Sequence, residues 1–326
     1  MVFNAKIAPF RGVSRFPLRV PAVPVREEEK ITTGESTTPA QDQYEPSFAD
    51  VLVTKAMLSR AFRLPPEIVD TIVDYAEYWP HTTTQVDATD DSLAARGSIH
   101  SEKEHVRENV FLLRSPPLGF HTWNRASRRT GGRPIHKTAP EPRPPGEEFS
   151  VDDFQRLIAS PSPLLARPCR RIVFTIRSRD QGWGGEWGDR GTYNGSWTWF
   201  EAGLERWCWP SGPGPAPSLL LLLPLAGRRP HDLLPREEYK VQCNVTAHGE
   251  ARTHRVVWSY TDSVDPERDV EAAARLEEQG RGKATGSGNF VRALKLGDVV
   301  TLWAKARFPG WVNHVESARL DVYYAV

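Results

Sequence analysis

The spacing of apolar residues along the chain changes from a helical period to the two-residue period of strands. Between Phe48 and Ala76, apolar side chains recur every three or four positions, in two stretches separated by Pro65 and Pro66. From Cys169 onward they recur at every second position, beginning with the stretch RRIVFTIRSR. The pattern predicts a small α module followed by a mainly β domain.

Each stretch of the α module has one apolar face. The first, FADVLVTKAMLSRAF, places at helical spacing Val51, Leu52, Met57, Leu58, Ala61 and Phe62. The second, EIVDTIVDYAEYW, places on one face Ile68, Val69, Ile72, Val73 and Ala76. Glu67 lies in the first turn of this helix, where it complements the helix dipole, and Pro80 ends the segment. Residues 47–80 are therefore predicted to form a short αα-hairpin.

The second half of the chain is a series of short strand candidates separated by Gly, Pro and Asp. In the first candidate, one face carries Ile172, Phe174 and Ile176. The later candidates are SWTWFEAGLERW, EYKVQCNVTAHG, THRVVWSYTD, NFVRALKLGDVVTLWAKARF and ESARLDVYYAV. One exception, DPERDVEAAARLEEQG, predicts an exposed helix inserted over residues 265–280. Because strands and helices do not alternate, residues 150–326 are predicted to form an antiparallel, jelly-roll-like β-sandwich.

Two other regions lack a sustained period. Residues 1–46 are polar and rich in Pro, Thr and Glu, and we expect a disordered arm there. Residues 81–149 are expected to be an irregular segment and a Pro-rich linker, with one strand candidate at residues 110–120. A short helix that begins near Ser150 leads into the β domain. The predicted fold class is mainly β, with a small α module.

The stretch DQGWGGEWGDRGTYNGSWTWFEAGLERWCW, residues 180–209, holds six of the eleven tryptophans. Its glycines permit the positive φ angles and tight turns that reverse the chain between two strands. Two interpretations of its loop tryptophans are open. In one, Trp183 covers the edge of the sandwich, with its indole N–H bonded to a carbonyl group. In the other, Trp183 and Trp187 form an exposed platform for a sugar or a peptide.

Polar residues near these tryptophans complete a candidate ligand site. In the binding interpretation, the polar partners in the loop are Asp180, Glu186, Asp189 and Arg190. A second Gly-containing turn, FPGWVNH, adds Trp311, Asn313 and His314. A histidine in such a position is either a structural group with satisfied hydrogen bonds or a ligand contact.

Composition and charge exclude several classes of function. With 42 basic and 41 acidic residues the net charge is +1, so no overall field favours nucleic acid or an anionic membrane. No apolar stretch is long enough to span a bilayer. Catalytic and metal-binding motifs such as HExxH, CxxC and GxSxG are absent, and the three cysteines are scattered. We therefore expect no cofactor, no metal and no enzymatic activity, with an enzyme of unknown class as the last alternative.

The same features suggest where the protein acts in the cell. The few, scattered cysteines fit a reducing compartment, and we expect the cytoplasm or the nucleus. The first 26 residues are basic and contain no acid, which leaves a mitochondrial transit peptide as the alternative.

The start of the second helix resembles an F-box, whose first helix opens with a Leu-Pro-x-Glu-Ile run. The matching residues in this chain are Leu64, Pro65, Glu67, Ile68 and Ile72. The resemblance implies docking on a Skp1-type adaptor of ubiquitin ligases. It ends after Trp79, where the pattern of the second and third F-box helices is missing.

A longer resemblance links the chain to uncharacterised, mainly fungal proteins in which an LPPEI…DYAEYW hairpin precedes a β domain. The shared motifs are DQGWGG…GTYNGSWTWFEAGLE and, further on, LWAKARFPGWVNHV. By shape, such a β domain can be compared with carbohydrate-binding jelly rolls and with plant phloem lectins attached to F-boxes. The resulting hypotheses are an adaptor that binds a client through the Gly/Trp loop and a lectin-like carbohydrate-binding protein.

Overall fold

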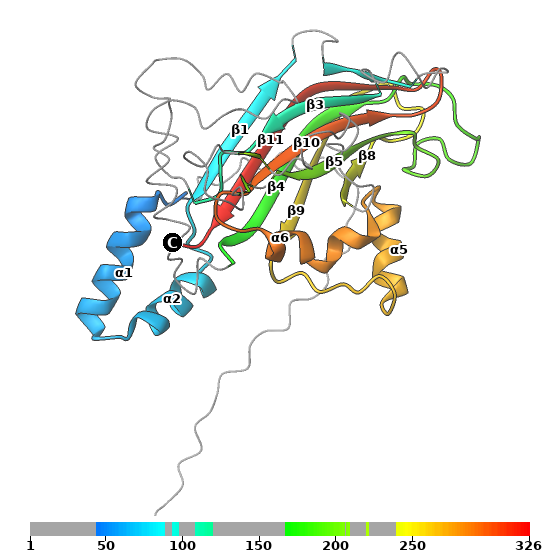
Figure 1. The fold of residues 1–326 in the computed structure, drawn as a ribbon. Helices are drawn as coiled ribbons and strands as arrows, with labels where there is room; N and C mark the ends of the chain where they lie inside the picture. Colours follow the sequence, from blue (N-terminus) through cyan, green and yellow to red (C-terminus); the bar gives the residue numbers. More distant parts are fainter. Residues whose placement is uncertain are drawn as a thin grey trace, which may run out of the picture. The chain divides into compact units, whose positions relative to one another are not determined.

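The computed structural model describes residues 44–88, 93–97, 108–119, 167–205, 207–208, 220–221 and 239–326. Within these ranges the main feature is a pair of antiparallel sheets (Figure 1). The predicted disordered arm, apart from its last three residues, lies outside the described residues, and so do the predicted helix near Ser150 and most of the Pro-rich linker. Among the helices in the described ranges, none is long and apolar enough to cross a membrane.

The first sheet has five strands and the second has four. The first consists, in order, of β1 (His81–Asp87), β11 (Val312–Tyr324), β4 (Cys169–Arg179) and β9 (Arg252–Ser259), with β2 (Ala95–Arg96) paired to the start of β11. The second consists, in order, of β3 (Asn109–Arg114), β10 (Val299–Ala306), β5 (Thr198–Glu205) and β8 (Lys240–Cys243). A separate ribbon joins β6 (Trp207–Cys208) to β7 (Leu220–Leu221).

The strand order is that of a jelly roll. If the eight strands β1, β3, β4, β5, β8, β9, β10 and β11 are numbered along the chain, the two sheets read 1-8-3-6 and 2-7-4-5. Each connection therefore passes from one sheet to the other, except that β5 and β8 pair side by side. This winding is the double-sheet jelly roll of two Greek keys. It confirms the fold class predicted from the sequence.

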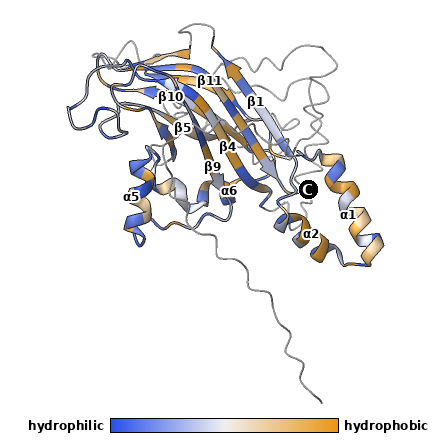
Figure 2. Ribbon diagram, turned by 180° about the vertical axis from the view of Figure 1, so that it is seen from behind, coloured by the Kyte–Doolittle hydropathy of each residue, from blue (hydrophilic) through white to orange (hydrophobic). Residues whose placement is uncertain are grey.

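The core lies between the sheets and follows the predicted period of two. On β4 the side chains of Ile172, Phe174 and Ile176 are buried, and Leu320 and Val322 continue this face on the neighbouring β11. The facing sheet contributes the buried side chains of Leu112, Phe200, Ala202, Leu302 and Ala304. Hydrophobic and hydrophilic positions alternate along the strands in Figure 2, as this arrangement requires.

The structure corrects the sequence-based prediction in two places. His81–Asp87 form β1 of the first sheet, where the pattern predicts an irregular segment, whereas β3 lies at the strand candidate predicted at residues 110–120. In β1 the residues that point toward the core are the buried Thr82 and Thr84. The alternating pattern that predicts a strand requires apolar residues at such positions, whereas threonine is polar and β-branched. The strand predicted from Asn289 starts only at Val299, because its first part forms the short helix α6 (Asn289–Ala293). The inserted helix is present as α5 (Val270–Glu278).

The two predicted helices of the hairpin are present as α1 (Phe48–Phe62) and α2 (Pro66–Tyr75). Ser47 begins α1 with a capping box, in which its side chain and that of Asp50 each bond the other residue's backbone N–H. The buried apolar side chains of this module are Val51, Val69, Val73 and Trp79. Of these, Trp79 contacts the β domain, with its ring edge-on to that of Tyr260 and the ring centroids 6.0 Å apart.

Asp74 ties the hairpin to the sandwich. Its carboxylate accepts hydrogen bonds from Nε and Nη2 of Arg170 on β4 at 2.9 and 2.8 Å, and from Nε1 of Trp79 at 2.8 Å. Lys55 on α1 pairs with Asp70 at 2.7 Å and also donates to the backbone oxygen of Val326. The hairpin and the sandwich accordingly belong to one compact unit, residues 44–326.

Some residues of the predicted apolar stripe of α2 are buried, and others are exposed to solvent. Val69 and Val73 are buried, whereas Ile68 and Ile72 are 48% and 40% exposed. Other large apolar side chains of the hairpin are also exposed: Leu52, Val53, Met57, Phe62 and Tyr75. Figure 2 shows hydrophobic residues along both α1 and α2. One face of the hairpin is therefore core and another is an apolar surface.

Candidate functional site

The Gly/Trp stretch forms the connection between β4 and β5, which we call the aromatic loop (residues 180–197). It lies at the end of the sandwich opposite the hairpin (Figure 1). The hairpin contacts Arg170 at the start of β4, and the loop follows Arg179 at its end. Since a strand rises about 3.3 Å per residue, these two ends are about 30 Å apart. The sandwich thus separates two surfaces rich in exposed apolar groups.

Asp180 anchors the aromatic loop through hydrogen bonds from backbone N–H groups. The residue is fully buried, and its carboxylate accepts backbone N–H groups of Gly182, Ala247 and His248 at 2.7, 2.6 and 2.9 Å. Ala247 has a positive φ of 56°, a conformation that these bonds help to hold. Burial raises the pKa of Asp180, and the three N–H donors oppose this rise. The structure corrects the prediction that Asp180 is a ligand contact, because its oxygens are engaged beneath the surface.

A buried polar cluster next to Asp180 joins the two sheets. Ser178 Oγ on β4 donates to Asn244 Oδ1 at 2.7 Å, and Asn244 Nδ2 donates to Thr198 Oγ1 at 3.0 Å and to Asn313 Oδ1 at 2.9 Å. Asn313 Nδ2 donates in turn to the backbone oxygen of Trp199 at 3.0 Å. This corrects the prediction for Asn313 as well: it lies in β11, and its side chain holds both ends of the loop in place.

The loop tryptophans are exposed, with Trp183 at 63% and Trp187 at 85%. The burial expected if Trp183 covered the sandwich edge is not observed. Trp183 lies beside the turn between β10 and β11, where a Cβ on Gly310 would come within 3.0 Å of its ring. From that turn, the half-buried Trp311 reaches back to Gly185, where a Cβ would lie 3.9 Å from its ring. The glycines therefore make room for rings contributed by the opposite loop.

Further aromatic side chains extend this surface. Trp197 at the end of the loop packs edge-on against Phe308, with ring centroids 4.4 Å apart, and both rings are exposed. We call the set Trp183, Trp187, Trp197, Phe308 and Trp311 the aromatic end surface. It combines the two segments that the sequence singled out, and it adds Phe308, which the sequence reasoning missed. The signal for Phe308 was its position next to the Pro-Gly turn, beside a conspicuous tryptophan.

The remaining predicted site residues lie around this surface. Arg190 is exposed, and its guanidinium lies 5.3 Å from the ring centroid of Trp187. Glu186 is exposed, and Asp189 is half-buried, with its carboxylate against Gly195. His314 is half-buried in β11, opposite Arg179. The structure therefore places Glu186, Arg190 and the tryptophans where a ligand can reach them.

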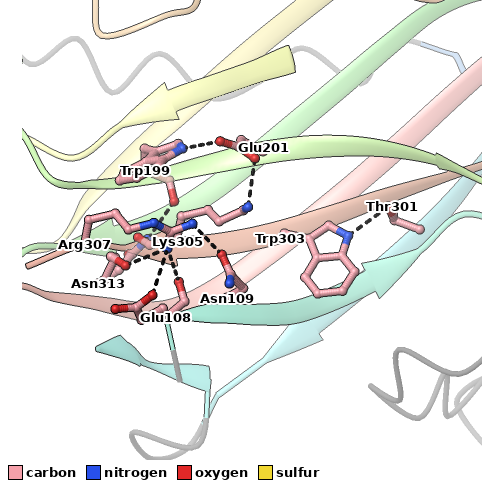
Figure 3. A network of polar contacts seen from close by, with 10 residues as sticks. Glu108, Asn109, Trp199, Glu201, Thr301, Trp303, Lys305, Arg307 and Asn313 are labelled. Carbon is pink, nitrogen blue, oxygen red and sulfur yellow. Dashed lines mark hydrogen bonds and ion pairs between the residues drawn. The ribbon is translucent and has the colours of Figure 1, made fainter. Parts of the chain in front are cut away.

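A ladder of ion pairs on the second sheet was not foreseen from the sequence (Figure 3). Glu201 on β5 pairs with Lys305 on β10 at 3.0 Å, both side chains being 3% exposed, and also accepts Nε1–H of Trp199 at 2.6 Å. Along the same face, Arg114 on β3 pairs with Glu205 at 2.7 Å. All of these side chains point away from the core between the sheets, since Phe200 and Ala202 on β5 point into it.

Arg307 connects the ladder to the aromatic end surface. Its guanidinium lies 5.4 Å from the ring centroid of Trp199 and donates to Asn109 Oδ1 at 2.9 Å (Figure 3). Its backbone N–H donates to the carbonyl of Trp197 at 3.0 Å. The exposed pair of Trp197 and Phe308 thus rests on a buried polar scaffold, which is the arrangement expected of a preformed binding surface.

The titratable groups of the described residues do not combine into a recognisable catalytic pair. The carboxylates of Glu201 and Glu205 are each matched by a cation. Burial raises the pKa of the Cys169 thiol to about 12. Burial and the nearby Arg252 and Arg281 lower the pKa of His254 to about 4, so this imidazole is neutral at physiological pH. In the described part of the chain no group of His, Cys, Asp and Glu side chains is arranged to hold a metal ion.

Comparison of this chain with protein-family models, with curated proteins and with solved structures finds no match. Functional conclusions therefore depend on the geometry of the two ends of the sandwich.

Proposed function

We propose that the protein is a non-catalytic interaction protein with two binding ends. In this proposal the hairpin docks on a Skp1-type adaptor, and the aromatic end surface binds a client or ligand about 30 Å away, as the strand rise implies. The observation that carries it is the exposure of large apolar side chains at both ends of one compact unit. The ion pair of Asp74 with Arg170 and the cluster around Asn313 fix each end to the same sandwich.

Two features support the hairpin as a docking surface. Ile68 and Ile72, which match the F-box pattern, are exposed, while Val69 and Val73 of the same helix are buried. A partner can therefore cover the isoleucines without unfolding the module. Exposed apolar groups gathered on one element are typical of protein-protein contacts.

A pull-down with a purified Skp1-type adaptor tests the docking surface. We expect the wild-type protein to be retained and the double variant Ile68→Asp/Ile72→Asp to bind at least about thirty-fold more weakly, since each buried isoleucine contributes 1 kcal/mol or more. Met57→Asp, an exposed residue of the same hairpin outside the F-box match, should bind like the wild type. Failure of the wild-type protein to bind would remove the adaptor role and leave the ligand-binding end untouched.

Exposure of Trp183 and Trp187 favours a second candidate function, a lectin-like carbohydrate-binding protein. Flat aromatic faces beside charged groups such as Glu186 and Arg190 suit sugar rings, whose apolar faces stack and whose hydroxyls form hydrogen bonds. The loops at the end of a sheet are a common place for such sites.

A glycan array tests the lectin-like candidate. We expect binding by the wild-type protein and a loss of at least about ten-fold for Trp183→Ala/Trp187→Ala, because a central tryptophan of an interface contributes 2 kcal/mol or more. The melting temperature should stay unchanged, since both rings are exposed. The control Tyr75→Ala removes an exposed aromatic ring from the other end of the molecule. A wild-type protein that binds no glycan on the array contradicts this candidate.

A further inference from the structure

The long excursion between β9 and β10 encloses a cavity at one edge of the sandwich. It contains α5, the 3-10 helix η5 (Lys283–Ser287) and α6, which lie beside β8 and β9 in Figure 1. These two strands are edge strands of their sheets. The cavity has a volume of about 340 Å³ and opens between the end of β9 and the excursion. This size falls within the range of small-molecule sites.

The walls of the cavity are held in place by backbone bonds. Val264 N–H donates to the carbonyl of Gly286 at 3.0 Å and so links its two sides. Arg292 donates to the carbonyls of Tyr260 and Asp262 at 2.7 and 2.8 Å and fixes the chain where it leaves β9. The cavity is therefore a preformed feature, which lowers the entropy cost of filling it.

One side of the cavity is apolar. Val257 and Trp258 at the end of β9 form its floor, and Val264 and Leu276 face it from the excursion. A Cβ on Gly286 would lie 2.6 Å from Leu276 Cδ1, so the absence of a side chain there allows Leu276 to pack close. These groups favour a ligand with an apolar body.

Arg281 brings a cation to the cavity, where the carboxylate of Asp262 is a nearby opposite charge. Among the described residues, no hydrogen bond or ion pair reaches its guanidinium, and its Nε is buried without a partner. Burial lowers the pKa of Arg281, and the nearby Tyr193 and Asp262 partly oppose this fall. A guanidinium in this position prefers a carboxylate, which it binds through two parallel hydrogen bonds.

Asp262 restricts the charge of the ligand. Its carboxylate lines the same cavity, accepts the backbone N–H of Ser259 at 2.7 Å and forms no ion pair with Arg281. Thr285 also lines the cavity, and its hydroxyl donates to the carbonyl of Gly282 at 2.6 Å. Asp262 repels a doubly charged anion about twice as strongly as a monoanion, so the cavity favours a monoanion that binds Arg281 and keeps its apolar part on the opposite wall.

We propose that this cavity binds a small organic monocarboxylate, with its carboxylate on Arg281 and its apolar body against Val257, Val264 and Leu276. No residue that lines this cavity belongs to the hairpin or to the aromatic end surface, so the proposal can be tested independently of both binding ends.

Calorimetric titration of the full chain with 4-methylpentanoate, its neutral amide and inorganic phosphate tests the proposal. We expect the carboxylate to bind at least about ten-fold more tightly than the amide or phosphate, since a charge-assisted bond contributes 1.5–3 kcal/mol. Arg281→Gln should lose this preference. Arg275→Gln, which removes an exposed arginine of α5 that pairs with Glu271, should keep it.

A second variant covers the case in which Arg281→Gln fails to fold. Leu276→Trp fills the cavity from the excursion and should abolish binding of the carboxylate while near-ultraviolet circular dichroism stays native. Equal binding of the acid and the amide, undiminished binding by a folded Arg281→Gln or Leu276→Trp variant, or no binding of the carboxylate by the wild-type protein would each overturn the proposal.

Discussion

Lys305→Met is expected to lower the free energy of unfolding by about 3–5 kcal/mol, the loss typical when a buried ion pair keeps only one member. Glu201 and Lys305 are 3% exposed and 3.0 Å apart, so the substitution leaves the Glu201 carboxylate buried with the Trp199 indole as its neighbouring donor. Urea-induced unfolding, followed by tryptophan fluorescence at neutral pH, measures the change. A loss this large would unfold a substantial fraction of a marginally stable protein.

A double-mutant cycle separates the ion pair from side-chain packing. Glu201→Gln/Lys305→Met removes both charges and keeps an oxygen acceptor for Trp199, so most of the lost stability should return. The control is the pair of Arg177 and Glu316, which also joins two strands at 2.6 Å but is about half exposed. Arg177→Gln should cost less than about 1 kcal/mol. Equal losses for Lys305→Met and Arg177→Gln would contradict the interpretation.

The strands that form the core could be predicted because their sequence pattern has a single physical explanation. Alternation at Ile172, Phe174 and Ile176 places three apolar side chains on one face, and a jelly roll buries that face against its second sheet. The inserted helix could be predicted for the same reason, from its period and its charged majority. β1 could not, since its inward residues are Thr82 and Thr84, and threonine occurs equally in loops.

The ion-pair ladder shows what a single-sequence pattern leaves undetermined. Glu201 and Lys305 lie on strands whose opposite face packs in the core. The same alternation of polar and apolar residues occurs when the polar face of a sheet is exposed to solvent. Their burial depends on residues far away in sequence, and so does the choice of partner across the strands. Periodicity therefore predicts on which face of a sheet a residue lies, but not whether that face is exposed to solvent.

Some features of the candidate site could likewise be predicted from the sequence, and others could not. The sequence indicated the aromatic loop, and the structure exposes Trp183 and Trp187 on it. Asp180 and Asn313 were grouped with them because polar residues beside tryptophans suggest a binding site. Both are instead buried anchors, because a loop with many glycines needs fixed hydrogen bonds to hold its shape. Polar residues next to a glycine loop thus have two roles, which only their burial distinguishes.

The anchoring role of Asp180 predicts a second large effect. Asp180→Ala removes the acceptor of three buried or partly buried N–H groups, those of Gly182, Ala247 and His248. Because each unsatisfied donor costs about 1–3 kcal/mol, and part of this is recovered by relaxation and water, we expect a loss of about 2–4 kcal/mol. Chemical denaturation measures the loss, and amide hydrogen exchange should accelerate most at these three positions.

A matched substitution within the same loop distinguishes anchoring from general loop sensitivity. Asp189 is a half-buried carboxylate of the aromatic loop without such backbone donors in the described structure, so Asp189→Ala should change stability by less than about 0.5 kcal/mol. Asp180→Asn keeps the shape of the side chain but turns an amide N–H₂ toward groups that are themselves donors, and should recover only part of the loss. If Asp180→Ala and Asp189→Ala were equally mild, the aromatic end surface would owe its shape to the glycines and to Asn313 rather than to the buried carboxylate.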